Sequence, residues 1–313
     1  MLKNYIGIDI GGMTIKGIII DGQGKILFED VIPTDAGKGE NAIGDNVVEL
    51  VNRMIINSKL YKNDFAGIGI GSPGLIDSER GNIVFAGNLM LNNYPLAKYV
   101  SERVGMPVKL TNDANAAALG EAKFGSGIKC RDSILVTLGT GVGGGIISEG
   151  KLFEGGKSAG AEIGHMVIVV DGERCSCGRK GCFESYASAT ALMEQTKRAM
   201  QQNKDSLMWQ KYTLDSVSGA TAFEYADKDE TAKQVVETYV KYLACGIINL
   251  VNVFRPQVVM LGGGVSAQGE KLTRPVQEIV NKEVFASSYA PVKIVTAKLG
   301  NKAGGIGAAA LFM

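Results

Sequence analysis

The chain alternates between short apolar runs that end at glycine and longer stretches in which apolar residues recur every three or four positions. Apolar runs rich in β-branched residues are typical of strands, whereas the longer spacing is typical of amphipathic helices. Strands are therefore predicted at residues 5–10, 15–21, 25–32, 65–71, 108–110, 133–138, 145–148, 258–261 and 292–297. Helices are predicted at residues 42–60, 96–104, 114–124, 187–201, 232–254 and 268–284, with a last helix from residue 303. Residues 203–230 are polar and weakly periodic, which predicts a loop or short helices.

The strand–turn–strand pattern of the N-terminal segment starts again near residue 133. With an offset of 128 residues, five residues of the first copy fall on identical residues of the second: Gly11, Gly17, Ile18, Ile19 and Gly22 on Gly139, Gly145, Ile146, Ile147 and Gly150. Two unrelated glycine hairpins could show a similar match by chance. The identities therefore support an internal repeat only in combination with the repeated order of elements. Both together predict two related halves, and 313 residues exceed the usual length of a chain with a single core.

Composition narrows the class of protein. The chain is 45% hydrophobic and 21% charged, with a net charge of +1, so it lacks the basic surplus of a nucleic-acid-binding protein. Its longest apolar stretch, residues 243–254, is interrupted by Asn249 and Asn252 and is shorter than the ~20 residues of a membrane span. The N-terminus shows no signal peptide. We therefore expect a cytoplasmic protein without a nucleic-acid or membrane partner.

The single histidine lies close to a cluster of cysteines. His165 precedes Cys175, Cys177 and Cys182, and one imidazole with three thiolates completes the tetrahedral shell of a structural zinc site. Four protein ligands leave no open position, which makes a catalytic zinc the weaker interpretation. The remaining alternative is a set of free cytosolic thiols beside an incidental histidine.

Two glutamates flank this metal loop. Glu162 lies three residues before His165, and Glu184 lies two residues after Cys182. Carboxylates held rigidly by a metal loop are suited to binding sugar hydroxyls. Without the metal loop, two solvent-exposed glutamates would be the simpler interpretation.

Three glycine-rich turns follow apolar strands directly, at residues 11–12, 139–145 and 262–264. Glycine lets the backbone approach a phosphate closely, so three such turns favour a nucleotide site over ordinary hairpins. The middle turn, GTGVGG, matches the dinucleotide pattern G-x-G-x-x-G, but a strand follows it where that pattern requires a helix. The chain also lacks a Walker A loop, so we expect the nucleotide between hairpins of two lobes.

Two aspartates stand where predicted strands end. Asp9 beside the first glycine turn is placed to hold Mg²⁺, directly or through water, or to cap the turn. Asp113 stands between a strand and a helix, where it is either a helix N-cap or the general base of a phosphoryl transfer. The scarcity of histidine favours a carboxylate base.

Seven motifs, in this order, resemble the bacterial ROK family of sugar kinases, in particular its ATP-dependent glucokinases: DIGGMTIKG, GSPGLID, NDANAAALGE, LGTGVGGG, EIGH, CSCGRKGCFES and LGGGVS. The resemblance runs from about residue 5 to the C-terminus. It implies an α/β, actin-like ATPase (ribonuclease H-like) fold with two lobes around a central cleft. Residues 1–121 and 300–313 would form the small lobe, and residues 122–299 the large lobe with the zinc loop.

The resemblance also implies a set of site residues. Asp113 would be the catalytic base, and sugar hydroxyls would be bound by Asn88, Asn112, Asp113, Glu162, His165 and Glu184, with His165 also a zinc ligand. ATP and Mg²⁺ would be bound by Asp9, Gly11, Gly12, Thr14, Lys16, Gly139, Thr140, Gly141, Gly262, Gly263 and Gly264. Such a protein would be a homodimer or homotetramer.

The implied activity is the transfer of the ATP γ-phosphate to a sugar hydroxyl, with glucose 6-phosphate as the first expected product. Kinases of N-acetylmannosamine, N-acetylglucosamine, fructose or a β-glucoside are alternatives, as is a non-enzymatic sugar sensor. ROK repressors carry an additional N-terminal DNA-binding domain, whereas the first strand here is predicted to begin by residue 5. Two positions depart from the family pattern: Met13 replaces a common threonine, and Leu91 replaces a common tryptophan of the sugar loop.

Overall fold

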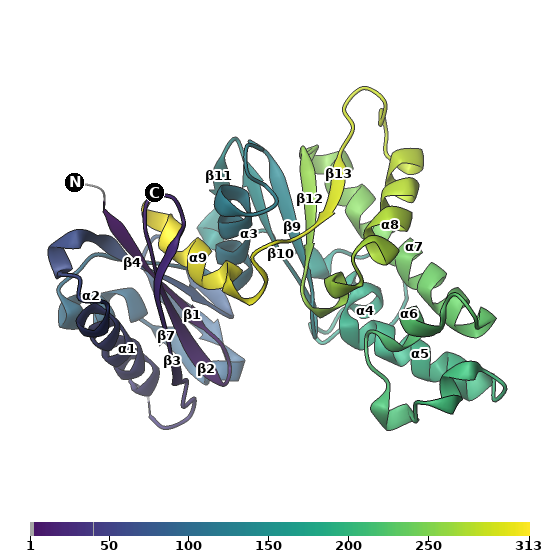
Figure 1. Ribbon diagram of the computed structural model, residues 1–313, viewed down its shortest axis with the longest axis horizontal. Coiled ribbons are helices and arrows are strands. Elements are labelled where there is room, and N and C mark those ends of the chain that lie inside the picture. The colour runs from purple at the N-terminus through teal and green to yellow at the C-terminus, as the bar shows by residue number, and fades with distance from the viewer. Residues whose placement is uncertain (1–2, 40) are drawn as a thin grey trace. The chain divides into compact units, whose positions relative to one another are not determined.

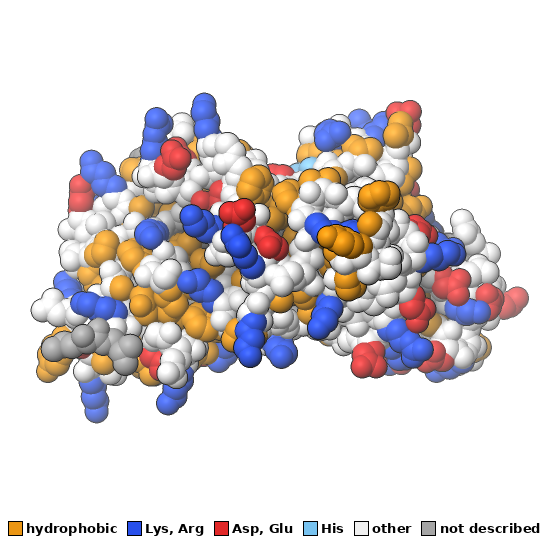
Figure 2. All heavy atoms as spheres, turned by 90° about the horizontal axis from the view of Figure 1, so that it is seen from above, with side chains coloured by type: hydrophobic (Ala, Val, Ile, Leu, Met, Phe, Trp, Pro, Cys, Tyr) orange, Lys and Arg blue, Asp and Glu red, His pale blue; other side chains and the backbone are white. Residues whose placement is uncertain are grey.

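The computed structural model describes residues 3–39 and 41–313 of the chain. The chain divides into two compact units, the first made of Met1–Cys130, Gly145–Ala161 and Lys298–Met313, and the second of Arg131–Gly144 and Glu162–Ala297. Among the described residues, no helix is both long and apolar enough to cross a membrane. On the face shown in Figure 2, basic side chains stand apart from one another and no broad patch of one sign forms.

The first unit is built on a five-stranded sheet with the order β3-β2-β1-β4-β8. Its strands are β1 (Asn4–Ile10), β2 (Thr14–Ile20), β3 (Ile26–Pro33), β4 (Phe65–Ser72) and β8 (Val108–Asn112). β1 pairs antiparallel with β2 and parallel with β4, and β4 pairs parallel with β8. The carboxyl ends of β1, β4 and β8 therefore lie at the same edge of the sheet.

Helices cover both faces of this sheet. A Cβ on Gly17 would lie 2.2 Å from the Sδ of Met54 in α1 (Ala42–Ser58), and a Cβ on Gly7 would lie 1.8 Å from the carbonyl oxygen of Gly305 in α9 (Ala303–Ala309). Gly7 pairs with Ile18, so these two residues face the same side of the sheet. Gly17 precedes Ile18 in β2 and faces the other side, so α1 and α9 lie on opposite faces. Figure 1 shows the C-terminal α9 beside the N-terminal β1. The first unit also contains α2 (Leu96–Val104) and α3 (Asp113–Phe124).

The second sheet repeats the order of the first, as β11-β10-β9-β12-β13. Its strands are β9 (Ser133–Leu138), β10 (Val142–Ser148), β11 (Lys151–Phe153), β12 (Val258–Gly262) and β13 (Lys293–Thr296). β2 and β10 are related by the same offset of 128 residues as the sequence identities: residues 14–20 correspond to residues 142–148. The predicted relationship between the two halves is confirmed in their topology.

The helices of the second unit are α4 (Glu184–Ala187), α5 (Ala189–Gln202), α6 (Thr221–Tyr225), α7 (Glu230–Phe254) and α8 (Glu270–Glu283). The predicted helix at 187–201 begins later, at Ala189, because the hydroxyl of Ser188 accepts a hydrogen bond from the backbone N–H of Ala191 and caps it. Residues 203–230 form short helices, as one of the two predicted alternatives.

One sheet was not predicted. β5 (Leu75–Asp77), β6 (Asn82–Ala86) and β7 (Leu91–Tyr94) form a three-stranded antiparallel sheet. Each of these strands has three to five residues, which is too short for an alternating pattern to stand out in the sequence.

The bounds of the units differ from the sequence-based division after residue 121. That division falls inside α3, which packs along α9 so closely that a Cβ on Gly307 would lie 1.6 Å from the carbonyl oxygen of Ala116. Residues 145–161 also belong to the first unit, where Glu154 accepts a hydrogen bond from the hydroxyl of Thr111 at 2.7 Å.

Candidate active site and metal centre

Asp113 is the first residue of α3, directly after β8. Asn112 is the N-cap of this helix, because its side-chain oxygen accepts hydrogen bonds from the backbone N–H groups of Ala114 at 2.9 Å and Asn115 at 3.4 Å. Asp113 accepts one hydrogen bond from Ala114 at 2.9 Å, and burial raises the pKa of its carboxyl. No lysine or arginine within the described ranges forms an ion pair with it. A carboxylate with a raised pKa and no cation partner has the properties of a proton acceptor.

Asp9 is the second carboxylate at this edge of the sheet. It pairs with Lys16 of β2 and with Gly71 of β4. Burial raises the pKa of Asp9, the negative charge of Asp113 raises it further, and Lys16 lowers it. A divalent cation would relieve the repulsion between the two carboxylates, so these residues fit the Mg²⁺ that the sequence predicts here.

The β1–β2 turn is held by hydrogen bonds of its own. The backbone N–H of Gly11 donates to the carbonyl of Thr14 at 2.9 Å, and the hydroxyl of Thr34 donates to the carbonyl of Gly11 at 2.6 Å. Met13 is 86% exposed and contributes little to packing. A Cβ on Gly12 would meet no atom of the described chain within 4 Å, and its φ lies outside the left-handed region. Neither packing nor backbone conformation requires glycine here, and the space beside Gly12 is open to a ligand.

Asn88 and Leu91 belong to the small sheet of the first unit. Asn88 is exposed in the 3₁₀ turn Gly87–Leu89, between β6 and β7. Leu91, which replaces the tryptophan common in the family, is only 5% exposed and packs in the hydrophobic core. Leu91 therefore presents no surface on which a sugar could stack.

The four predicted metal ligands come together in the second unit. The ligand atoms of His165, Cys175, Cys177 and Cys182 all lie within 4.8 Å of one another. The Sγ atoms of Cys177 and Cys182 are 3.7 Å apart, and the Sγ of Cys175 lies 3.6 Å from the Nδ1 of His165. A tetrahedral zinc ion sets an S···S separation of about 3.8 Å and an S···N separation of about 3.6 Å. The geometry and the donor set therefore fit a zinc ion.

The electrostatics of the cluster agree with this assignment. Burial and the sulfurs of Cys175 and Cys177 raise the pKa of Cys182 to about 12. Three thiolates crowded in this way repel one another, and a divalent cation offsets that repulsion.

Backbone hydrogen bonds and two glycines shape the metal loop. The N–H of Cys175 donates to the carbonyl of Arg179 at 2.9 Å, and the N–H of Gly181 donates to the carbonyl of Glu173 at 2.8 Å. Gly178 and Gly181 have φ of 89° and 78°, a left-handed conformation that glycine adopts without strain. A Cβ on Gly181 would also lie 1.7 Å from the carbonyl oxygen of Val169.

Glu162 and His165 are joined by one tight turn. The backbone N–H of His165 donates to the carbonyl of Glu162 at 3.1 Å, across the 3₁₀ turn Ile163–His165. This turn packs on β10 so closely that a Cβ on Gly164 would lie 2.0 Å from the carbonyl oxygen of Val142.

Glu184 connects the metal loop with the β9–β10 turn. Its Oε2 accepts a hydrogen bond from the backbone N–H of Val142 at 3.1 Å, and its Oε1 accepts one from the hydroxyl of Ser176 at 3.3 Å. The thiol of Cys175 lies 3.6 Å from the same Oε1. A Cβ on Gly141 would lie 2.0 Å from Oε2, so glycine at this position makes room for the carboxylate.

The two glycine turns of the second unit are neighbours, because β9 and β12 pair up to Thr137 and Gly262. The turn after β9 is fixed by the hydroxyl of Thr190, which donates to the carbonyl of Thr140 at 2.8 Å. The turn after β12 is fixed by Gly263, which has a φ of 79° and whose Cβ would lie 2.5 Å from the carbonyl oxygen of Leu138. Cβ atoms on Gly139 and Gly264 would meet no atom of the described chain within 4 Å, as at Gly12.

Apart from Asn88, which lies in the turn between β6 and β7, the predicted site residues thus form one group in each unit. In the first unit, Asp9, Gly11, Gly12, Thr14, Lys16, Asn112 and Asp113 lie at or near the sheet edge, and the amide of Asn112 donates to the carbonyl of Gly74 at 3.2 Å. In the second unit, Glu184 lies beside the turn at residues 139–141 and contacts Cys175 of the metal cluster, and Gly164, between Glu162 and His165, packs on Val142.

Sequence reasoning missed one residue that supports this arrangement. Glu154 accepts hydrogen bonds from the hydroxyls of Thr111 at 2.7 Å and Ser78 at 2.8 Å, and Thr111 directly precedes Asn112. No motif marks Glu154, because its partners lie 43 and 76 residues away in the sequence.

Comparison with known proteins agrees with this geometry. Glucokinase of Halalkalibacterium halodurans is 35% identical over 97% of this chain and 93% of that protein. The xylose repressor of Caldicellulosiruptor bescii is 31% identical over 98% of this chain and 77% of the repressor. A ROK family glucokinase from Streptomyces griseus, solved with glucose and AMPPNP, is 35% identical, with a TM-score of 0.79 over 99% of both chains.

A ROK hexokinase from Thermus thermophilus is 30% identical, with a TM-score of 0.83 over 98% of this chain and 96% of that one. These similarities confirm the predicted two-lobe α/β fold of the actin-like ATPase class. The ROK family matches residues 5–313, which is nearly the full length of the sequence. The chain therefore belongs to the ROK family.

Proposed function

We propose that this protein is an ATP-dependent sugar kinase that transfers the γ-phosphoryl group of ATP to a hexose hydroxyl, with glucose as the first candidate. The observation that carries the proposal is Asp113, whose pKa is raised by burial and which no cation pairs with among the described residues. Phosphoryl transfer needs positioned groups, charge stabilisation and one acceptor for the proton of the attacking hydroxyl. In this proposal Asp113 accepts that proton.

Five further residues are assigned to the sugar. Asn88, Asn112, Glu162, His165 and Glu184 are proposed to bind its hydroxyls. The Nδ1 of His165 faces Cys175, which leaves Nε2 for a hydroxyl while the ring also holds zinc. Zinc would have a structural role, because the four protein ligands complete its shell. It would hold His165 and Glu184 in fixed positions relative to each other.

Nucleotide binding is assigned to the glycine turns. Gly12, Gly139 and Gly264 have open space where a side chain would be, which supports close approach of phosphate or ribose to the backbone. Gly11, Thr14, Thr140, Gly141, Gly262 and Gly263 complete these turns, and Asp9 with Lys16 is proposed to hold the magnesium ion and the phosphates. A bound Mg²⁺ would neutralise charge on the phosphates.

A sugar-responsive regulator is the second candidate function, because a xylose repressor is 31% identical to this chain. The two functions share sugar binding and differ in turnover. A kinase also needs a proton acceptor, a role that the half-buried carboxyl of Asp113 fits.

The experiment that tests the proposal is an ADP-release assay over free hexoses, N-acetylhexosamines and β-glucosides. We expect turnover with glucose. Turnover with another sugar of the panel instead would change the assigned substrate but not the assigned reaction. ADP release that is the same with and without every sugar would contradict the kinase and favour the regulator. Asp113→Asn serves as the control, since it should bind sugar without turnover.

A further inference from the structure

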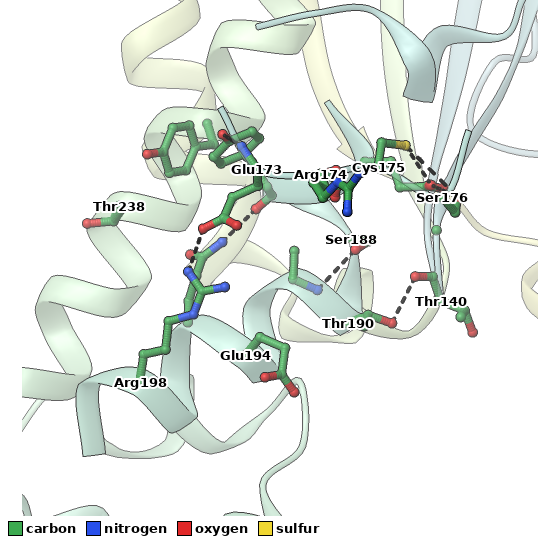
Figure 3. A pocket seen from close by; sticks show the side chains of 17 residues that line it. Thr140, Glu173, Arg174, Cys175, Ser176, Ser188, Thr190, Glu194, Arg198 and Thr238 are labelled. Atoms are coloured by element: carbon green, nitrogen blue, oxygen red, sulfur yellow. Dashed lines mark hydrogen bonds and ion pairs between the residues drawn. The ribbon is translucent and has the colours of Figure 1, made fainter. Parts of the chain in front are cut away.

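The second unit contains a pocket most of whose lining residues have no role in the kinase proposal. It has a volume of about 540 Å³, within the range of about 300–1,000 Å³ that small-molecule sites occupy. Figure 3 shows its walls, which come from the metal loop, α5 and α7. Glu162 and His165 do not line it, whereas four residues of the kinase proposal do: Thr140, Gly141, Cys175 and Glu184.

Several polar groups on the pocket wall are held in place by the protein. The guanidinium of Arg198 donates to the carboxylate of Glu173 at 2.6 Å, and the backbone N–H of Glu173 donates to the hydroxyl oxygen of Tyr186 at 2.6 Å. Figure 3 shows Glu173 and Arg198 facing each other, with Thr238 on the neighbouring helix. Groups fixed in this way lose little conformational freedom when they bind a ligand.

One polar atom on the wall has no partner. The amide nitrogen of Gln195 donates to the carbonyl of Tyr186 at 2.8 Å, which fixes the orientation of the side chain. Its Oε1 is buried and accepts no hydrogen bond from any described residue. A buried acceptor without a donor costs free energy, and a ligand donor reaches this atom only when the side chain turns toward the pocket.

The charges and rings of the wall define the chemistry of that ligand. Three carboxylates (Glu173, Glu184 and Glu194) face two guanidinium groups (Arg174 and Arg198), so the wall carries no positive surplus for an anion.

The ring centroids of Tyr186 and Tyr242 lie 4.6 Å apart. Tyr186 is buried, so the half-buried ring of Tyr242 offers the apolar face at this wall. Carboxylates, guanidinium groups and amides bind hydroxyl groups, and aromatic faces pack against the C–H surface of a ring. A neutral molecule with many hydroxyls and an apolar face satisfies all of these groups.

We propose that this pocket is a second binding site for a neutral, unphosphorylated sugar. Its binding groups are Arg174, Glu194 and Arg198, with the ring of Tyr242 as the apolar wall. These binding groups are not shared with the sugar site of the kinase proposal, although Glu184 of that site also lines the pocket, and binding here does not depend on turnover.

Equilibrium dialysis with radiolabelled glucose tests the proposal. We expect two glucose sites per chain in the unaltered protein, of which Glu162→Gln weakens only the site of the proposed kinase. The double variant Arg174→Ala/Glu194→Ala should weaken the pocket site by at least about tenfold, because it removes two hydrogen-bonding charged groups. Both side chains are exposed and Arg174 forms no ion pair among the described residues, so the variant should keep its fold.

The matched control is Arg274→Ala/Glu278→Ala, an exposed pair on α8 outside the pocket, which should leave both sites unchanged. Equal glucose binding by the pocket variant and the control would overturn the proposal. Stronger binding of glucose 6-phosphate than of glucose at this site would overturn the neutral class.

A pocket variant that changes the mass of the protein in sedimentation, while glucose binding stays the same, would assign the pocket to a second copy of the chain and also overturn it. If the kinase proposal fails, the result is different. The protein then shows no turnover, but glucose still binds in the pocket and the double variant still weakens that binding.

Discussion

Asp9 and Asp113 lie at the same edge of the first sheet, and the charge of Asp113 raises the pKa of Asp9. Gly71 lies between them: it pairs with Asp9, and a Cβ on it would lie 3.6 Å from the Cα of Asp113. Two like charges placed together in a half-buried position cost folding free energy, and perturbed carboxyl pairs of this kind concentrate at functional sites.

Asp113→Asn should abolish most turnover while sugar binding is retained. Asparagine has nearly the same shape but cannot accept the hydroxyl proton, and loss of a general base costs about 10²–10⁴-fold in rate. The measurement is kcat from ADP release together with sugar affinity from equilibrium dialysis. Turnover close to that of the unaltered protein would remove Asp113 from the role of base.

The same substitution should stabilise the fold, and more at neutral than at acidic pH. The folded-state pKa of Asp113 is raised, so the folded protein binds this proton more tightly than the unfolded chain does. The stability it contributes is complete below the ordinary aspartate pKa of about 3.9 and is lost as the pH rises through the raised value. The Tm difference between Asp113→Asn and the unaltered protein should therefore be larger at pH 7 than near pH 4. A difference that shrinks as pH rises would contradict this.

The sequence predicts the two large sheets well, because their strands are long apolar runs that end at glycine. It predicts the metal cluster too, since the distance from Cys175 to Cys182 along the chain is short and local turns join the ligands. It misses the β5–β7 sheet and the network around Glu154, because short strands and long-range hydrogen bonds leave no local pattern. The sequence also leaves open whether Asp113 is the N-cap of its helix. The hydrogen bond that Asn112 accepts from Ala114 shows that Asn112 is the N-cap instead.

Cys177→Ala should lose the metal. Zinc bound by one histidine and three cysteines would be present at about one ion per chain, and an alanine removes one of four ligands. Elemental analysis should show stoichiometric zinc in the unaltered protein and much less in the variant, with a lower Tm because metal binding stabilises the folded loop. Cys245→Ala is the matched control, since this cysteine lies outside the cluster, and it should keep its zinc. Full zinc in Cys177→Ala would contradict the four-ligand site.

Leu91→Trp should destabilise the protein without changing its sugar preference. The leucine is 5% exposed in the core, and overpacking a core costs about 1–3 kcal/mol. Asn92→Trp, at an exposed neighbouring position of β7, is the control and should leave Tm nearly unchanged. Thermal unfolding with the sugar panel measures both effects. A changed sugar preference at unchanged Tm would show that residue 91 reaches the sugar.

Gly141→Ala and Gly139→Ala should separate sugar binding from nucleotide binding. A Cβ on residue 141 would lie 2.0 Å from the Oε2 of Glu184, so it displaces the carboxylate from the N–H of Val142 and should raise KM for the sugar. A Cβ on residue 139 meets no protein atom within 4 Å and projects into the space proposed for phosphate, so Gly139→Ala should raise KM for ATP at an unchanged Tm. Steady-state kinetics with each substrate varied in turn distinguishes the two. The opposite pattern would show that the two turn residues have been assigned to the wrong substrates.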